Sequence, residues 1–321
     1  MKGIDLVKTA KMKWILAAFA LLLLLSGCSN ERESLAIAEQ YGLAYAPVTI
    51  MKEKGFLSDR LSGVEIEWKQ MANTAAIREA MVGGDLDIGF MAIPPFLIGA
   101  DKGMRWKIVS GLSEVPVALV SLDEGIRKLS DFTESDRIAL PQPGSIQHML
   151  LSMAAEKELG DSGYFDDRIV TMTHPDGMHA LLSKADIAGH FTSPPYLFME
   201  LENEEAHVVL TGKEAMGERF TFVVGVSMDE FSIKNPLREA AFKEALEEAV
   251  LFMKENPKEA SAVLSEAYGI EEEKIHEYIT REDMVYTMEV AGMQKFHDFM
   301  ESRGYIENLG EMADLTRGDG S

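Results

Sequence analysis

Two stretches of the chain decide the fold. Residues 75–97 read AAIREAMVGGDLDIGFMAIPPFL, and residues 178–197 read MHALLSKADIAGHFTSPPYL. Each has the pattern of a helix, an acidic turn, a short strand and a loop that ends in Pro-Pro-aromatic-Leu. A repeat about 100 residues apart indicates two similar lobes, although so short a pattern can also recur by chance. Ligands of open α/β sheets bind beyond the carboxyl ends of the strands, so two facing ends predict a cleft.

The segments around the first copy alternate between strand and helix patterns. Residues 34–40 and 64–68 read as strands, and residues 47–54 read as a helix with Pro at its start and Gly just after its end. Three more helices are expected, beginning near Pro236, Pro257 and Met288. The alternation predicts an α/β fold with a largely parallel sheet.

The first 27 residues are predicted to be a targeting segment. Four lysines precede an apolar run of about 12 residues, and a spanning helix needs roughly 20. This pattern is typical of a secretory signal peptide. Leu25-Ser26-Gly27-Cys28 resembles a bacterial lipobox, which implies lipidation of Cys28; a cysteine that merely follows a signal peptide is the alternative. Residues 28–33 are expected to form a tether, and residues 316–321 a disordered tail.

The charge balance excludes one class of partner. The chain has a net charge of -22, and the part after residue 27 is three charges more negative, because residues 1–27 hold four lysines and one aspartate. Binding to a nucleic-acid backbone needs clustered Lys and Arg, so no nucleic-acid partner is expected. Adhesion to anionic lipid by charge is disfavoured too, so contact with the membrane is expected through the lipid anchor only.

Four segments, in this order, resemble the solute-binding proteins of the nitrate, sulfonate and taurine importers. They are YGLAYAP at 41–47, AMVGGDLDIG at 80–89, Gly144-Ser145, and FVVGV at 222–226. The resemblance implies a type II periplasmic-binding-protein fold, with two similar α/β lobes joined by a two-strand hinge. It implies that residues 34–124 plus 220–315 form lobe one and that residues 125–219 form lobe two.

The resemblance also implies a function. An extracytoplasmic lipoprotein, anchored to the bacterial cell membrane, would capture a small organic solute and deliver it to an ABC permease and its ATPase. A sulfonate, a carboxylate and a pyrimidine-like solute all stay open, and the protein is expected to be a monomer. No cofactor, metal or catalysis is expected, because no phosphate-cradling loop, nucleophile elbow or zinc pattern is found.

Two alternatives to an importer component remain. One is a ligand-sensing lipoprotein that has no importer of its own. The other is an enzyme that resembles the thiamine-pyrimidine synthases on the same fold. Those enzymes carry a cysteine-rich motif, whereas Cys28 is the single cysteine of this chain. They also work in the cytoplasm, which the predicted signal peptide contradicts.

Candidate ligand groups lie where predicted strands pass into loops and helices. Helix starts offer backbone N–H groups and the positive end of the helix dipole to an anion, although their residues can be simple caps. The residues at these starts are Asn73, Thr74, Gly144 and Ser145. Met91 and Ile93 precede the first Pro-Pro pair, and Thr192 and Ser193 precede the second. If these loops do more than turn the chain, one apolar and one hydroxyl-bearing wall predict a solute with an apolar body and a polar head, not bare nitrate.

Aromatic and imidazole side chains complete the candidate set. Tyr41 and Tyr45 are placed to stack on a ligand or to hydrogen-bond with it, and Phe222 lies at the predicted hinge. His148 and His190 flank the predicted cleft. Each of these residues can instead be structural, and a lone histidine is more often a structural hydrogen-bonding group than a ligand contact.

Overall fold

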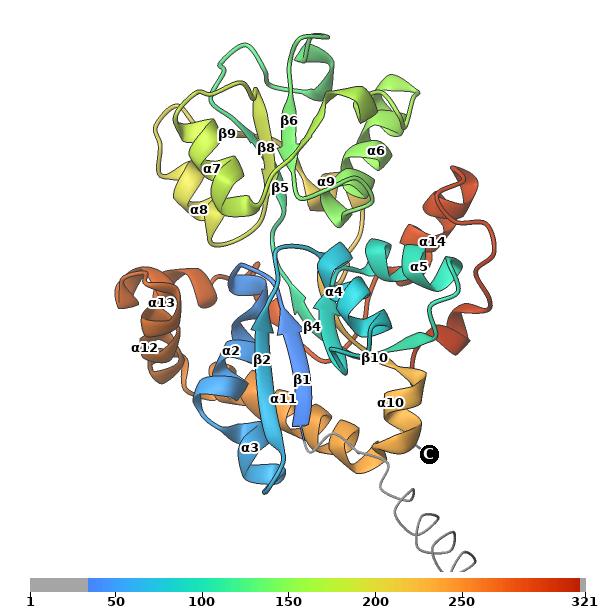
Figure 1. The fold of residues 1–321 in the computed structure, drawn as a ribbon. Helices are drawn as coiled ribbons and strands as arrows, with labels where there is room; N and C mark the ends of the chain where they lie inside the picture. The colour runs from blue at the N-terminus through green and yellow to red at the C-terminus, as the bar shows by residue number, and fades with distance from the viewer. Residues whose placement is uncertain (1–33, 318–321) are drawn as a thin grey trace, which may run out of the picture.

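The computed structural model describes residues 34–317, which form two lobes, each around its own sheet (Figure 1). The predicted signal peptide, Cys28 and the tether at residues 28–33 lie outside the described residues, as do residues 318–321. The larger sheet has six strands and the smaller has five. Helices cover both sheets, so the fold is α/β with two lobes, as the sequence predicted.

The sheet of lobe one has the order β11-β4-β10-β3-β1-β2. In it β1 pairs in parallel with β2 and β3, while β10 runs antiparallel to β3 and β4. The sheet is therefore mixed, and its parallel part is confined to one half. Its strands are β1 (Ser34–Glu39), β2 (Glu65–Gln70), β3 (Ile88–Met91), β4 (Trp106–Glu114), β10 (Val223–Met228) and β11 (Val285–Tyr286).

The sheet of lobe two has the order β7-β6-β8-β5-β9 and the same plan. Here β6 pairs in parallel with β7 and β8, and β5 runs antiparallel to β8 and β9. Its strands are β5 (Ala118–Ser121), β6 (Ile138–Leu140), β7 (Ile169–Thr171), β8 (Gly189–Thr192) and β9 (His207–Thr211). In each lobe one strand, β1 or β6, thus has two parallel neighbours, as expected for a duplicated unit.

Helices flank both sheets and continue as a C-terminal group on lobe one (Figure 1). Those of lobe one are η1 (Leu43–Tyr45), α2 (Ala46–Glu53), α3 (Phe56–Arg60), α4 (Thr74–Val82), α5 (Ile93–Asp101), α10 (Asp229–Lys234), α11 (Pro236–Glu255), α12 (Pro257–Tyr268), α13 (Glu272–Ile279), α14 (Met293–Ser302) and η4 (Met312–Leu315). Those of lobe two are η2 (Leu129–Asp131), α6 (Ile146–Leu159), η3 (Asp166–Arg168), α7 (His174–Leu182), α8 (Tyr196–Leu201) and α9 (Gly212–Met216).

The chain passes between the sheets earlier than the sequence suggested. The expected boundary at residue 124 placed β5 in lobe one, but β5 pairs with β8 and β9 of the second sheet. The first crossing is therefore residues 115–117, between β4 and β5. The apolar sequence of residues 117–122 carries no information about which strands β5 pairs with.

The expected disordered tail also begins too early. Thr316 forms a parallel β-bridge with Ile108 of β4, and the backbone N–H of Arg317 donates to the carbonyl of Ile108 (2.9 Å). The guanidinium of Arg317 lies 3.1 Å from the carboxylate of Asp229. These two residues are held by the sheet edge, which their Gly- and Asp-rich successors do not indicate.

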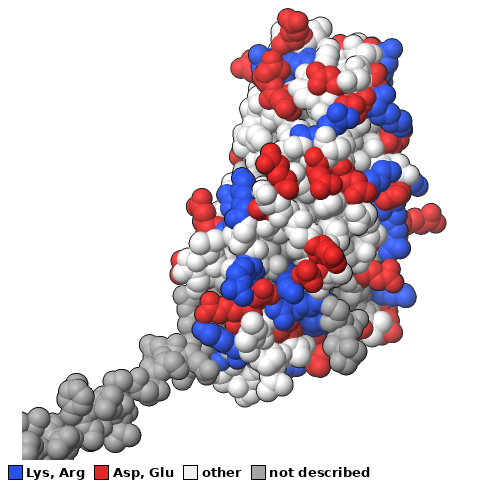
Figure 2. All heavy atoms as spheres, turned by 90° about the vertical axis from the view of Figure 1, so that its right-hand side faces the viewer, with Lys and Arg blue, Asp and Glu red and all other residues white. Residues whose placement is uncertain are grey.

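The surface carries both signs of charge. On the face shown in Figure 2, Lys and Arg side chains are interspersed with Asp and Glu over both lobes. Mixed charge of this kind keeps a protein soluble and offers no continuous basic footprint for nucleic acid on that face. None of the helices between residues 34 and 317 is long and apolar enough to span a bilayer.

Candidate ligand cleft

A cavity lies between the two lobes, at the carboxyl ends of their parallel strands. Loops after β1, β2 and β3 line it from lobe one, and loops after β6, β7 and β8 line it from lobe two. Phe222 and Val223 also line it, where the chain returns from lobe two to β10 of lobe one. The lining consists of Gln40, Tyr41, Tyr45, Ala72, Asn73, Thr74, Ala92, Pro95, Pro141, Gln142, Ser145, Ile146, Gln147, Thr173, His174, Ser193, Phe222 and Val223. This is the position that the repeat predicted for a cleft.

Three capped helix N-termini meet at this cavity. The side chain of Asn73 accepts a hydrogen bond from the N–H of Ala76 at the start of α4 (3.0 Å). Ser145 caps α6 and Thr173 caps α7 in the same way. The first N–H groups of a helix have no partner within the helix, and the dipole makes this end positive. The cavity therefore favours an anion or another hydrogen-bond acceptor.

No Asp, Glu, Lys or Arg occurs among the described residues that line the cavity. Its polar groups are amides, hydroxyls and one imidazole. Burial, with a smaller contribution from His190, lowers the pKa of that imidazole, His174, to about 3, so it is neutral at pH 7. A dianion would enter without a compensating cation, which is unfavourable in a desolvated site. A monoanion or a neutral polar head suits these groups better.

The loop after β1 is held from both lobes. The hydroxyl of Tyr268 donates to the carbonyl of Gly42 (3.1 Å), and that of Tyr286 donates to the carbonyl of Leu43 (3.0 Å). The N–H of Leu43 donates across the cleft to the carbonyl of Pro194 in lobe two (2.9 Å). Gly42 has a φ of 119°, and a Cβ there would lie 3.0 Å from the same carbonyl. The lobes are thus in direct contact at the rim of the cavity.

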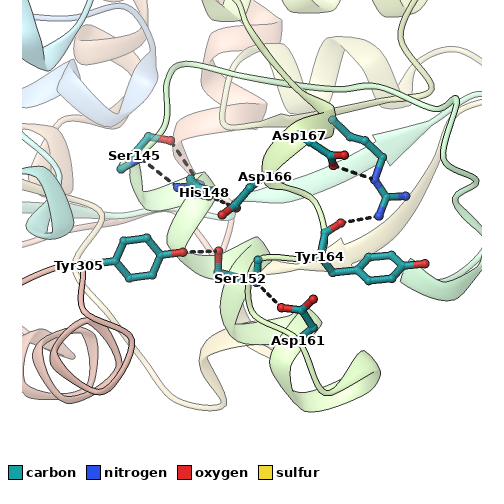
Figure 3. A network of polar contacts seen from close by, with 11 residues as sticks. Ser145, His148, Ser152, Asp161, Tyr164, Asp166, Asp167 and Tyr305 are labelled. Atoms are coloured by element: carbon teal, nitrogen blue, oxygen red, sulfur yellow. Dashed lines mark hydrogen bonds and ion pairs between the residues drawn. The ribbon is translucent and has the colours of Figure 1, made fainter.

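His148 does not line the cavity, and Figure 3 shows its imidazole beside Asp166 and the Ser145 turn. The N–H of Gly144 donates to Nδ1 of His148 (3.0 Å), so the proton of this imidazole is on Nε2, which donates to Asp166 (2.9 Å). The N–H of His148 itself donates to Oγ of Ser145 (3.3 Å). His148 therefore holds the Gly144–Ser145 turn in place, while Ser145 faces the cavity.

The structure brings seven of the thirteen candidate residues to the cavity wall, and His190 is not one of them, since it is completely buried. The seven are Tyr41, Tyr45, Asn73, Thr74, Ser145, Ser193 and Phe222. It does not bring Met91 or Ile93 there, since both are fully buried in lobe one. Gly144, His148 and Thr192 are also absent from the wall; Oγ1 of Thr192 lies 3.2 Å from Nδ1 of His174. The apolar wall consists instead of Ala72, Ala92, Pro95, Pro141, Ile146 and Val223.

Sequence reasoning missed several polar residues of the wall. Gln40 lies just after β1, and its amide donates to Oγ1 of Thr74 (3.1 Å). Gln147 lies in the first turn of α6. Thr173 and His174 start α7 in the same way as Asn73 and Thr74 start α4. The second copy of the sequence repeat begins at residue 178, so Thr173 and His174 lie just before it.

A buried polar chain leads away from the cavity. Nδ1 of His174 lies 3.4 Å from Nε2 of His190, and Nδ1 of His190 lies 2.5 Å from Oε1 of Glu200. His190 and Glu200 are completely buried. On the other side, Nε2 of His174 lies 3.2 Å from Nε2 of the Gln147 amide, whose nitrogen and oxygen exchange places on a 180° turn. Among residues 34–317 no three His, Cys, Asp or Glu side chains are placed to hold a metal ion.

The two lobes and the cavity between the ends of their parallel strands define a two-lobed binding protein of the type II periplasmic-binding-protein fold. The chain belongs to the NMT1-like family, whose model matches residues 29–266. No curated protein sequence is significantly similar to the chain.

Solved structures share this fold at low sequence identity. The alkanesulfonate-binding protein of Xanthomonas axonopodis pv. citri, bound to MOPS, superposes with a TM-score of 0.75 at 18% identity, over 90% of this chain and 99% of that one. The periplasmic aliphatic sulphonate-binding protein of Escherichia coli gives 0.70 at 18%, over 90% and 93%. The periplasmic nitrate-binding protein of Synechocystis PCC 6803 gives 0.70 at 15%, over 89% and 84%. The predicted fold is thereby confirmed.

Proposed function

We propose that this protein is an extracytoplasmic solute-binding lipoprotein that delivers a small organic solute to an ABC permease and its ATPase. The observation that carries the proposal is the cavity between the lobes, which is free of charged side chains and faces three helix N-termini. Such a site binds and orients a polar head without offering a nucleophile or an acid–base pair to it. Residues 34–114 with 223–317 are proposed as lobe one, and residues 118–216 as lobe two.

The solute is proposed to have an acceptor head and an apolar body. The three helix starts suit sulfonate or carboxylate oxygens, while Pro95, Pro141, Ile146 and Phe222 offer apolar surface to the rest of the molecule. The related structures named for sulfonates and the one bound to MOPS support this class. The proposed contacts are Tyr41, Tyr45, Asn73, Thr74, Ser145, Ser193 and Phe222.

Closure of the lobes is proposed to report binding to the permease. Outside the cavity the lobes are joined by exposed polar contacts, such as Lys274 to Glu202 (2.8 Å) and Arg303 to Glu156. Exposed ion pairs typically contribute about 0–1 kcal/mol each, so they leave the open and closed forms close in free energy. A solute that touches both walls then shifts this balance by its differential affinity.

Titration calorimetry and small-angle scattering over a panel of sulfonates, carboxylates and pyrimidines test the proposal. We expect at least one solute both to bind and to compact the protein. Ser145→Ala removes a hydroxyl of the cavity wall and should weaken that binding about tenfold. Ser183→Ala, at the exposed end of α7, is the matched control and should bind as the wild type does. A panel in which no solute binds with compaction would refute the proposal.

The anchor at Cys28 is a separate part of the proposal. β1 begins at Ser34, so only a short segment would separate the lipid from lobe one. Labelling of expressing bacteria with a radioactive fatty acid should mark the wild type and leave Cys28→Ser unmarked. Release of the wild type into the medium without label would contradict the anchor but not the solute site.

A further inference from the structure

The buried chain Glu200–His190–His174 reaches the cavity from the core of lobe two. Glu200 lies on α8, His190 on β8 and His174 at the first position of α7. Nδ1 of His174 faces His190 and Thr192, so its Nε2 edge is the one beside Gln147, a residue of the cavity wall. The ring of Tyr196 stacks on His174 with an interplanar angle of 21°, which restricts rotation of the imidazole.

Glu200 is best accommodated as a neutral acid. Its side chain is fully buried, and its Oε2 has no hydrogen-bond partner. An ionised carboxylate with one unsolvated oxygen is far more costly to bury than a carboxylic acid. In agreement with this, burial raises the pKa of Glu200 to about 9 and lowers that of His190 to about 3.

A neutral Glu200 determines the proton on each imidazole in turn. Its O–H donates to Nδ1 of His190, so the proton of His190 must be on Nε2. That N–H points at Nδ1 of His174, which must therefore accept, and the proton of His174 must be on Nε2. Nε2 of Gln147 is the amide atom beside this N–H, so a 180° turn of the amide presents its oxygen there, and an acceptor oxygen of a solute can take that place. An ionised Glu200 would reverse every bond and leave Nε2 of His174 as an acceptor.

We infer that His174 is a solute contact that presents an Nε2–H donor to the cavity, and that Glu200, acting through His190, is the positioning residue that selects this tautomer. The inference rests on the proposed function and narrows it: the head group must offer an acceptor oxygen at this place. A fixed donor excludes alkylammonium heads, which carry only donors. Neutral donors of this kind complement the helix N-termini without introducing a charge into the cavity.

The tautomer can be read without any solute. Long-range ¹H–¹⁵N correlation spectra of the protein labelled in its seven histidines, assigned by single substitutions, distinguish protonated from unprotonated ring nitrogens. We expect His174 to be protonated on Nε2 and not on Nδ1. We expect Glu200→Ala to lose this preference and Glu200→Gln to restore it, because the carboxamide N–H can donate to Nδ1 of His190. Protonation of His174 on Nδ1 in the wild type would overturn the inference, whatever the protein binds.

Binding of two probes with the same tail tests the contact. Butane-1-sulfonate carries an acceptor head and butylammonium a donor head, and we expect the protein to prefer the sulfonate. His174→Phe should lower its affinity about tenfold to hundredfold, the effect of losing a hydrogen bond to a charged group. His297→Gln, on α14 and outside the cavity wall, is the control and should have no effect.

Equal binding of the sulfonate by wild type and His174→Phe would contradict the proposed role of His174, as would a preference for butylammonium. Either result would still be compatible with a solute-binding protein. If neither probe binds the wild type, the proposal that His174 binds an acceptor head group is refuted. The proposed function itself fails only if the wider panel of solutes also fails, so the two failures can be told apart.

Discussion

The two copies of the repeat build the same frame and fill it differently. In lobe one, α4 packs on β3 with Ile77 over Gly89, where a Cβ of the glycine would lie 2.6 Å from the Ile77 side chain. In lobe two, α7 packs on β8 with the large and small residues exchanged, and a Cβ of Gly177 would lie 2.4 Å from Nε2 of His190. Gly89 and His190 are equivalent because Gly89 pairs with Ala38 of β1 and His190 with Ala139 of β6, each one residue before the end of its strand. The next residue of β3, Phe90, packs on Phe242 of α11, with 5.9 Å between ring centroids. His190 instead joins a hydrogen-bonded chain.

This difference indicates what the buried polar pair is for. The frame forms in lobe one with Ile77 over Gly89, so the architecture itself does not require a buried histidine and glutamate. Buried polar pairs are often no more stabilising than well-packed apolar residues of similar volume. The pair instead fixes which atom donates and which accepts in each hydrogen bond of the chain, and the last of these bonds is at the cavity.

The largest effect is expected from burying an imidazole in the core of lobe one. Phe90→His removes the contact with Phe242 and buries an imidazole in a fully apolar part of the core. Together these losses should lower the free energy of unfolding by about 3–5 kcal/mol. Urea denaturation followed by tryptophan fluorescence and circular dichroism measures it. A loss below about 1 kcal/mol would show that the core of lobe one accommodates an imidazole as readily as that of lobe two and would break the comparison.

The opposite change in lobe two is the comparison variant. His190→Phe combined with Glu200→Ala replaces the buried polar pair with apolar side chains, and its unfolding free energy at pH 7 should stay within about 2 kcal/mol of the wild type. Solute affinity should nevertheless fall, because the tautomer of His174 is no longer determined. In this variant solute affinity should fall while stability is largely kept, whereas Phe90→His should lower stability.

A smaller effect is expected where α7 passes over His190. A Cβ at Gly177 would lie 2.4 Å from Nε2 of His190, so Gly177→Ala must displace the ring or the helix. Overpacking of this kind typically costs about 1–3 kcal/mol, and it should weaken solute binding as well. Gly310→Ala is the control, since a Cβ there meets nothing within 4 Å. If Gly177→Ala matched the control in both measurements, the ring would not need the space that the glycine leaves.

The frame was predictable from sequence because local signals specify it. Asn73, Ser145, Pro236 and Pro257 mark helix starts through capping and a fixed φ, and each acts within one turn of its own position. The cavity wall was predictable only in part. Whether a residue at a strand end faces the cavity or the core depends on where strand pairing stops. Thr192 forms the last pair of β8 with β5, and Ser193, just after it, lines the cavity.

Long-range partners account for the other errors. On α11, Leu237 is 83% exposed, whereas Phe242 and Leu246 are buried. Alanines occur around the whole circumference of that helix, so its sequence does not define which face is apolar. Packing against lobe one determines which face is buried. His174 gains its role from His190 and Glu200, which lie on other elements. No spacing rule within a single helix or strand connects these three residues.

The pH dependence of stability sharpens the comparison further. An ordinary Glu in the unfolded chain ionises near pH 4.5, while burial raises the pKa of folded Glu200 to about 9. Between these values the folded chain holds the extra proton, so wild-type stability falls as the pH rises. The double variant His190→Phe/Glu200→Ala lacks this loss. From pH 7 to pH 8.5, where His190 is neutral in both states, its stability relative to wild type should rise by about 1.4 kcal/mol per pH unit. A difference that stays constant over this range would mean that folded Glu200 is ionised.

The smallest effect is expected at the acidic turns of the two copies. Asp87 accepts a hydrogen bond from the N–H of Ala36 at the start of β1 (2.9 Å), and Asp87→Ala should cost about 1 kcal/mol. Asp186 is exposed, because the second copy has one residue more between this turn and Pro194. Both copies keep the equivalent backbone bond, from the N–H of Asp87 to the carbonyl of Ala36 (3.0 Å) and from the N–H of Ala188 to the carbonyl of Arg137 (2.8 Å). Asp186→Ala should therefore stay within about 0.5 kcal/mol of wild type in the same urea denaturation. Equal costs at both positions would mean that the inserted residue leaves the role of the carboxylate unchanged.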